Sequence, residues 1–398
     1  MYFQTLDNKG ECLGYYANNE LRYEPLPQGA DKTWHYSEPL KDRYIEYARI
    51  YAGGLTLAEA CPEELRSEWE GVTTRLRSFL KSFRTSQINL NETCIYNLIP
   101  EFFLYELCDA KNKITQHIIE TYPRPTNHDF MVEVIKMLED IKTQPLNIDI
   151  KPIMTKFVSV KGKNFIRKLQ EVQHICDYNP FGTVTGRLTT QPKTFPILTL
   201  HRDFRGCLHP QNDWFLELDY NAAEVRTLLG LSGTPQPTGD IHAWNIENIY
   251  DGKVDRREAK QKIFEWLYSH RENKKAAAFY DKNLVKEKYW DGTNIYTEFG
   301  RTIKEVDDHH ALSYTVQSTT SDLVMTKAVE IHERLKELES NVAFMLHDSI
   351  VIDLKHEDRQ MIPELMNIFG STPFGEYKVN VALGKNFGDM KDLNINGS

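Results

Sequence analysis

The stretch NVAFMLHDSIVIDL, residues 341–354, strongly constrains the fold of this chain. Two almost wholly apolar runs flank the polar triplet His347, Asp348 and Ser349, and this pattern predicts a buried β-hairpin with the triplet at its tip. A carboxylate held so close to buried strands is costly unless it has a partner. Either the tip of a tight hairpin happens to be polar, or the strands hold Asp348 in place for a partner group elsewhere in the chain.

A second stretch offers such a group. In WFLELDYNAAEVRTLLGLSG, residues 214–233, a short β-type run ends at Asp219 and an apolar pattern of helical period follows it. If folding brings Asp219 and Asp348 together, their repulsion disfavours ionisation of both unless a cation lies between them. Mg²⁺ binds one or two carboxylates together with substrate phosphates, and two such ions about 4 Å apart can assist phosphoryl transfer. From spacing alone, two unrelated acids at strand ends remain an alternative.

A third stretch, RREAKQKIFEWLYS at residues 256–269, predicts a helix with a stripe of residues four apart. The stripe begins with the cations Arg256 and Lys260 and continues with the aromatic Phe264 and Tyr268. A triphosphate could lie along the cationic half while its base stacks near the aromatic half. A helix with a mixed solvent-exposed face is the alternative.

Taken in order, these stretches resemble the motifs of family A DNA polymerases, the bacterial DNA polymerase I type, over roughly residues 176 to 390. LDYNAAEVR resembles motif A (DYSQIELR), RREAKQKIFEWLYS resembles motif B (RRxAKxxNFGxxYG), and LHDSIV resembles motif C (xHDExx). TGRLTT at 185–190, DIH at 240–242 and QSTTSD at 317–322 are similar to further family segments that occur in the same order. The resemblance implies template-directed addition of dNMP to a primer 3′-OH by two-metal-ion phosphoryl transfer.

The resemblance also implies a role for each matching residue. The metal ligands would be Asp219, Asp348 and the carbonyl of Tyr220, holding two Mg²⁺ that Mn²⁺ could replace. Lys260 would be catalytic alongside the two aspartates, as a proton donor to departing pyrophosphate. The residues that contact the incoming dNTP would be Glu224, His242, Arg256, Lys260, Phe264 and Tyr268, with Glu224 leaving no room for a ribose 2′-hydroxyl. The residues that touch primer-template DNA would be Arg187, Gln317 and His347.

The sequence departs from the family pattern at several positions. Ser349 stands where motif C usually has a glutamate, so a third carboxylate near the metals is missing. Ala222 and Ala223 replace the Gln-Ile pair of motif A, and motif B carries Ile263, Glu265 and Ser269 in place of asparagine and glycines.

We expect an α+β protein with the right-hand polymerase fold, an antiparallel palm sheet, and helical thumb and fingers. The expected parts are a small β-rich N-terminal segment (1–39), a helical thumb region (40–150), the first part of the palm (151–240), the fingers (241–310) and the second part of the palm (311–398). The opening segment lacks the paired acids of a proofreading site, so we expect a compact form without 3′→5′ exonuclease activity, which would suit a phage-encoded enzyme.

Composition limits the setting in which such a protein works. Six cysteines without a CxxC pair indicate reduced thiols. The chain has neither a signal-peptide pattern nor a long apolar run, so we expect no membrane association. The net charge of −9 argues against a surface coated with basic residues, although a local basic groove could still bind DNA. We expect a cytoplasmic, DNA-associated protein of a bacterial or phage-infected cell, with a separate exonuclease, helicase or processivity factor as possible partners.

Three other functions compete with this interpretation. A single-subunit RNA polymerase would share the palm, but such enzymes lack the gate glutamate that Glu224 resembles. An HD-type metallophosphohydrolase would need His347-Asp348 on a helix and further metal histidines, whereas His309-His310 falls in a stretch that reads as a polar loop. A catalytically degenerate polymerase fold that acts as a DNA-binding or replisome module is the third alternative, favoured by Ser349 and the altered motif B.

Overall fold

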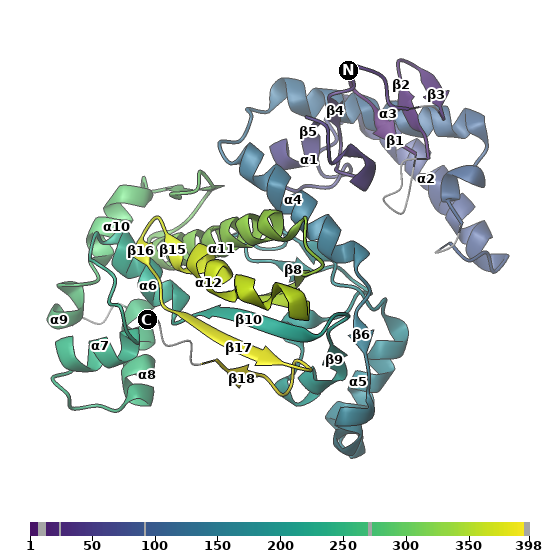
Figure 1. Cartoon of the computed structure of the whole chain (residues 1–398). Coiled ribbons are helices and arrows are strands. Elements are labelled where there is room, and N and C mark those ends of the chain that lie inside the picture. The colour runs from purple at the N-terminus through teal and green to yellow at the C-terminus, as the bar shows by residue number, and fades with distance from the viewer. Residues whose placement is uncertain (7–12, 24, 91–92, 270–272, 394–398) are drawn as a thin grey trace. The chain divides into compact units, whose positions relative to one another are not determined.

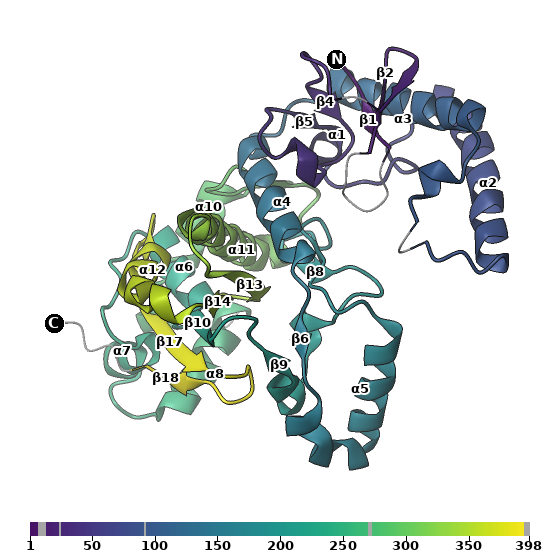
Figure 2. The same ribbon diagram turned by 45° about the vertical axis from the view of Figure 1, so that its right-hand side comes forward.

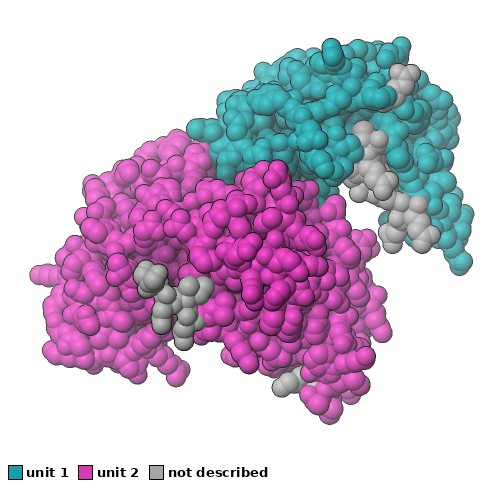
Figure 3. Space-filling model, viewed as in Figure 1, with its two compact units in different colours: residues 1–139 teal, residues 140–398 magenta. Residues whose placement is uncertain are grey.

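A computed structural model of the chain describes residues 1–6, 13–23, 25–90, 93–269 and 273–393. The chain divides into two units, Met1–Glu139 and Asp140–Ser398 (Figure 3). Each unit is described by itself below, since each has its own core. The five-part division expected from the sequence remains a prediction.

The first unit combines short strands with long helices. Strands β1 (Gln4–Thr5), β2 (Tyr15–Ala17) and β3 (Glu20–Arg22) form an antiparallel meander in the order β1-β2-β3, within the segment 1–39 that is expected to be β-rich. Strands β4 (Lys32–Thr33) and β5 (Glu46–Tyr47) form a separate parallel pair. The helices are α1 (Ala48–Tyr51), α2 (Glu63–Thr85), α3 (Glu101–Thr121) and α4 (His128–Thr143), with 3-10 turns η1 (Glu38–Leu40) and η2 (Ile95–Asn97).

The core of the first unit lies between α2 and α3. An apolar stripe of α2 packs there, with Val72 and Phe83 buried against Phe103 and Leu107 of α3. The meander packs on the same helix α3, because Leu6 and Tyr16 form a cluster with Cys108. The first strands and the long helices therefore share one unit.

A five-stranded antiparallel sheet organises the second unit, in the order β13-β14-β10-β17-β18. Its strands are β10 (Trp214–Tyr220), β13 (Asn341–Leu346), β14 (Ser349–Leu354), β17 (Val379–Gly384) and β18 (Lys391–Asp392). Every residue of β14 is buried, which explains the continuous apolar run that follows Asp348. Strand β10 lies at the centre of the sheet, paired on both sides.

Helices α11 (Asp308–Leu335) and α12 (Ile362–Gly370) lie together over one face of this sheet (Figure 1 and Figure 2). Successive side chains of a strand point to opposite faces. On β10, Leu216, Leu218 and Tyr220 are buried, with Tyr220 stacked on Phe369 of α12. Asp219 therefore points to the opposite face, which these two helices do not cover.

The remaining helices of the second unit pack beside the sheet on a shared apolar cluster that includes Leu228, Ile241, Ile263 and Tyr280. They are α6 (Ala223–Leu231), α7 (Ile241–Asn248), α8 (Arg256–Leu267), α9 (Lys274–Ala277) and α10 (Lys282–Tyr289). Helix α5 (Val160–Glu171) lies earlier in the chain, between the 3-10 segments η3 (Lys151–Val158) and η5 (Arg202–Cys207).

Short elements complete the second unit. The strands are β6 (Asn147–Ile148), β7 (Tyr178–Asn179), β8 (Thr189–Thr190), β9 (Leu208–His209), β11 (Ile295–Tyr296), β12 (Thr302–Ile303), β15 (Ser371–Thr372) and β16 (Gly375–Glu376). The 3-10 turns are η4 (Ile197–Thr199) and η6 (His356–Met361).

Two further expectations concern the whole chain. The five cysteines within the described residues are free and buried, whereas Cys12 lies outside them. Among the described helices, none combines the length and apolar character that crossing a bilayer requires.

Candidate active site

Asp219 is mounted near the end of the central strand β10. The next residue, Tyr220, is locked by its ring stacking on Phe369 and by its hydroxyl, which donates to the Phe369 carbonyl oxygen at 2.6 Å. Because the Tyr220 side chain is committed to this packing, only its main chain is left to face a ligand. At Ala222 the backbone takes a left-handed conformation (φ 56°), which turns the chain from the strand into α6. This turn ends the strand close to Asp219.

Asp348 occupies the turn of the hairpin β13–β14, as the sequence predicts. Leu346 pairs with Ser349, so His347 and Asp348 form the two-residue tip, and His347 has a positive φ of 56°. Ser349 also pairs with Asp219 across the neighbouring strands β14 and β10. The residue after Asp348 is therefore directly opposite Asp219, and the two acids, far apart in the chain, become neighbours.

A buried tyrosine supports the hairpin from outside the sheet. The hydroxyl of Tyr178 donates to the Met345 carbonyl oxygen at 2.7 Å and accepts from the Met345 N–H at 3.0 Å. The side chain of Ser349 donates to Glu217 Oε1 at 3.2 Å, in the position where the family pattern has a glutamate. The tip that carries Asp348 is thus fixed on both sides.

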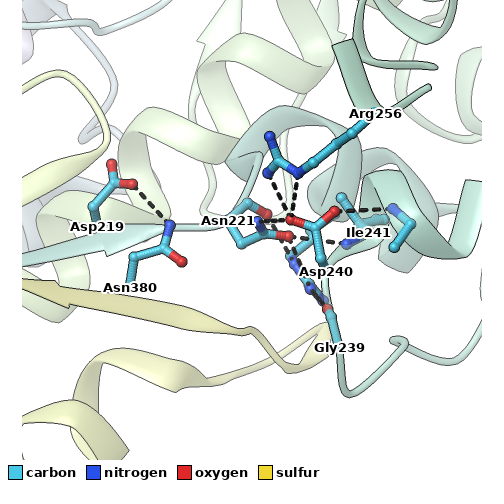
Figure 4. A network of polar contacts seen from close by, with 9 residues as sticks. Asp219, Asn221, Gly239, Asp240, Ile241, Arg256 and Asn380 are labelled. Carbon is cyan, nitrogen blue, oxygen red and sulfur yellow. Dashed lines mark hydrogen bonds and ion pairs between the residues drawn. The ribbon is translucent and has the colours of Figure 1, made fainter. Parts of the chain in front are cut away.

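Asp219 and Asp348 influence each other electrostatically. Burial, followed by repulsion from Asp348, raises the pKa of the Asp219 carboxyl to about 7. Burial also raises the pKa of Asp348 above its ordinary value. Two buried acids that resist ionisation together suit a cation between them. Asn380 of β17, which the sequence reasoning missed, donates to Asp219 Oδ2 at 3.2 Å (Figure 4).

The donor set fits magnesium better than a metal that needs many protein ligands. Within the described ranges, no group of three or more His, Cys, Asp or Glu side chains is arranged to hold a metal ion. Mg²⁺ is commonly held by one or two carboxylates, with water and substrate phosphates as its other ligands. Asp219 and Asp348 match that mode, while the role of the Tyr220 carbonyl remains a prediction.

A cavity of about 520 Å³ gathers nearly all the residues predicted to form the site. Tyr268 is the exception among the predicted residues, and it contacts the cavity-lining Glu224 instead. The predicted residues that line the cavity are Arg187, Asp219, Tyr220, Glu224, His242, Arg256, Lys260, Phe264, Gln317, His347 and Asp348. These side chains come from separate segments of the second unit, so the fold brings them together.

Helix α8 turns most of its predicted stripe toward this cavity. Asp255 caps the helix by accepting from the Glu258 N–H at 2.8 Å, and Ile263 and Trp266 are buried on the other side. Arg256, Lys260 and Phe264 consequently line the cavity. Tyr268 follows the last helical residue, with its ring stacked 6.4 Å from that of Phe264.

Glu224 is held from two directions. A guanidinium nitrogen of Arg187 and the hydroxyl of Tyr268 both donate to its carboxylate. Burial and then the Glu224 charge raise the pKa of Tyr268 well above its ordinary value, so the tyrosine remains a donor. The contacts join the 185–190 segment, α6 and the end of α8 at one side chain.

His242 lies buried in the same cavity as a neutral imidazole. Its Nδ1 atom has no hydrogen-bond partner among the described residues. Burial, reinforced by the charges of Arg256 and Lys260, lowers the pKa of His242 to about 4, although Asp240 opposes this shift. A neutral ring with a free nitrogen can receive or donate one hydrogen bond to a ligand.

We expect His242 to contribute to acid destabilisation. A histidine whose pKa is lowered by folding contributes stability above its unfolded pKa of about 6.5, and that stability is lost as the pH falls toward 4. Between pH 7 and pH 4.5, the wild type should therefore lose about 2 kcal/mol that a His242→Gln variant does not lose. Urea unfolding at both pH values measures this, with the exposed His356→Gln as control. Equal losses in wild type and His242→Gln would contradict the assignment.

One local prediction is wrong. His309 and His310 do not lie in a polar loop but in the first turn of α11. The reason is Asp307, whose side chain accepts from the His310 N–H at 2.9 Å and caps the helix. His347-Asp348 lies in a strand-flanked turn and not on a helix, so the helical HD arrangement is absent at this pair.

Comparisons with known proteins identify a shared fold. No protein-family model matches the chain, and no curated protein matches it in sequence. A solved structure, the POL domain of Pol1 from M. smegmatis in complex with DNA primer-template and dNTP, matches with a TM-score of 0.61 and 11% sequence identity. The match covers 87% of this chain and 82% of that chain. The chain thus has a fold similar to that of a polymerase domain.

Proposed function

We propose that this protein is a DNA polymerase that extends a primer 3′-OH on a DNA template with dNTPs. The observation that carries the proposal is the meeting of Asp219 and Asp348 in one cavity with the cationic face of α8. The likeness to a polymerase domain that was solved with primer-template and dNTP supports the same function. We further propose that the protein works without 3′→5′ proofreading, as a member of family A.

The carboxylates of Asp219 and Asp348, with the Tyr220 carbonyl, would hold two Mg²⁺. When bound, such ions stabilise the attacking and leaving oxygens of an in-line displacement. The rigid mounting of both acids matters, because a misplacement of about 1 Å can reduce the rate about 10²-fold.

The other cavity residues bind and orient the reactants. Arg256 and His242 hold the triphosphate, and Lys260 supplies a proton to the departing pyrophosphate. Phe264 and Tyr268 stack beside the incoming base and the template position. Three residues from other segments hold the primer-template near its end: Arg187, Gln317 and His347.

Primer extension by the purified protein tests the proposal. Labelled primer-template, dNTPs and Mg²⁺ should yield template-directed products, and chelation of the metal should stop synthesis. A primer with a 3′ mismatch should be kept without trimming. A protein that shifts DNA in a gel but extends no primer would be the degenerate binding module that Ser349 leaves open.

The sugar choice of the enzyme should depend on Glu224. In a Glu224→Ala variant, the preference for dNTP over rNTP should fall by about 10- to 10²-fold, because the side chain that fills the space for a 2′-hydroxyl is gone. The measurement is kcat/KM for matched dNTP and rNTP incorporation. A Glu265→Ala variant on the exposed side of α8 is the control, and an unchanged preference in Glu224→Ala would refute the gate. A wild type that prefers rNTPs would favour an RNA polymerase.

A further inference from the structure

The guanidinium of Arg256 is held by another residue of the same unit, Asp240. Oδ2 of Asp240 accepts hydrogen bonds from Arg256 Nε at 3.2 Å and from a terminal guanidinium nitrogen at 2.6 Å (Figure 4). Arginine binds phosphate oxygens through the same N–H donors. The Asp240 carboxylate therefore binds the same Arg256 guanidinium that the proposed function assigns to the triphosphate.

Asp240 is fixed in place by contacts that do not involve Arg256. Its Oδ1 accepts from the Ala243 N–H at 2.9 Å, which caps α7, and its Oδ2 accepts from Asn221 Nδ2 at 2.9 Å. Asn221 Oδ1 in turn accepts from the Ile241 N–H at 3.0 Å. These bonds tie the carboxylate to the chain that follows strand β10.

The buried Arg226 stabilises the main chain next to Asn221 and Asp240. Its side chain is fully buried and donates to the Asn221 carbonyl oxygen at 2.9 Å and to the Gly239 carbonyl oxygen at 2.6 Å. Burial alone would raise the pKa of Asp240, but the hydrogen bonds from Arg256, Ala243 and Asn221 hold that pKa well below its ordinary value. Asp240 is thus a fixed and ionised acceptor.

The two partners differ in their access to solvent. The Arg256 side chain is 59% exposed, whereas that of Asp240 is 22% exposed. A ligand in the cavity can therefore reach the guanidinium and draw it away. Asp240 would keep its bonds from Ala243 and Asn221 after this exchange, so no buried carboxylate would be left without partners.

We propose that Asp240 competes with the triphosphate for Arg256 and thereby weakens nucleotide binding by the free protein. This inference rests on the proposed function, since it deepens the role given there to Arg256. Binding of a triphosphate requires the Arg256–Asp240 pair to separate. The free energy that stabilises this pair is therefore subtracted from the free energy of triphosphate binding.

Replacement of Asp240 by asparagine removes the carboxylate charge but keeps a side-chain oxygen that can cap α7. Asparagine is as good a cap as aspartate, so α7 should remain intact. Titration calorimetry with dATP and with inorganic tripolyphosphate, in Mg²⁺ and without DNA, should show about two- to five-fold tighter binding by Asp240→Asn, the range for a pair this exposed. The control is Asp255→Asn, which removes the same charge next to Arg256 in the chain and also preserves a cap.

A double-mutant cycle distinguishes competition from simple repulsion between Asp240 and the phosphates. In an Arg256→Gln background, the gain from Asp240→Asn should disappear, because there is no guanidinium to release. A gain that is equally large in that background would overturn the inference. So would weaker or unchanged binding by Asp240→Asn, a gain equally large in Asp255→Asn, or absence of triphosphate binding in every variant. Primer extension by the wild type judges the proposed function separately, so active protein with unaltered Asp240→Asn affinity would defeat this inference alone.

Discussion

An Asp219→Asn variant should lose primer extension by about 10³-fold or more while it still binds primer-template DNA. The side chain keeps its shape but no longer carries the charge that holds a divalent cation, and metal assistance contributes several kcal/mol at about 1.4 kcal/mol per tenfold in rate. Single-turnover extension measures the loss, and a gel shift measures DNA binding.

The same variant should not be destabilised. Because the pKa of Asp219 is raised to about 7, ionisation of this group costs stability as the pH rises from about 4 to 7. Without Mg²⁺ at pH 8, Asp219→Asn should therefore unfold at the same or a higher temperature than the wild type. Asp213→Asn, immediately before the first residue of the same strand, is the activity control. Extension by Asp219→Asn at more than a tenth of the wild-type rate would remove the metal assignment.

An Asp322→Ala variant should lose about 3–5 kcal/mol of folding stability, the usual result of removing one partner of a buried ion pair. Asp322 in α11 is fully buried and accepts from Arg301 at 3.0 Å and 2.6 Å. Burial raises the pKa of Asp322, and the Arg301 charge opposes that shift. Without the carboxylate, the 11% exposed Arg301 would retain a charge with little access to water.

The pair matters for the site because Gly186 lies directly against Arg301. A Cβ atom at Gly186 would lie only 2.5 Å from the guanidinium carbon, and the Gly186 carbonyl oxygen accepts from Ser321 Oγ at 3.0 Å. The next residue is Arg187, which contacts Glu224. The Arg301–Asp322 pair therefore supports the turn that directs Arg187 into the cavity.

Chemical unfolding of Asp322→Ala beside two further variants checks the stability prediction. Glu333→Ala is the matched control, since it removes an exposed ion pair with Lys336 at the end of the same helix and should cost under about 1 kcal/mol. An Arg301→Ala/Asp322→Ala double variant should be more stable than Asp322→Ala alone, because it leaves no unpaired buried charge. A loss below 1 kcal/mol in Asp322→Ala would show that the pair is not structural.

The local elements that carry the site could be read from the sequence because their patterns are regular. The alternation and apolar runs around Asp219 and Asp348 predict a strand, a helix and a hairpin, and all three are present. The four-residue spacing of Arg256, Lys260 and Phe264 likewise predicts one helix face. These features depend on neighbours along the chain, which the sequence displays.

Contacts between distant segments could not be read in this way. Nothing near Arg301 indicates that its partner is Asp322, and nothing near Asn380 indicates that it donates to Asp219. In the sequence, Asp240 stands out only as part of the DIH triplet at 240–242, yet its carboxylate accepts hydrogen bonds from Arg256. Such pairs depend on the packing of α8, α11 and the sheet, which single-sequence patterns do not specify.

The central position of β10 in the sheet determines which side chains around Asp219 and Asp348 can change. Asp219 lies on β10, and Asp348 lies in the turn immediately before Ser349, the β14 residue that pairs with Asp219. The separation of their main chains therefore follows from the ladder and its spacing of about 4.8 Å. Main-chain amides and carbonyls are supplied by almost any amino acid. The side chains around the two acids, such as Ser349, Ala222 and Ala223, can therefore vary without altering the separation of the two acids.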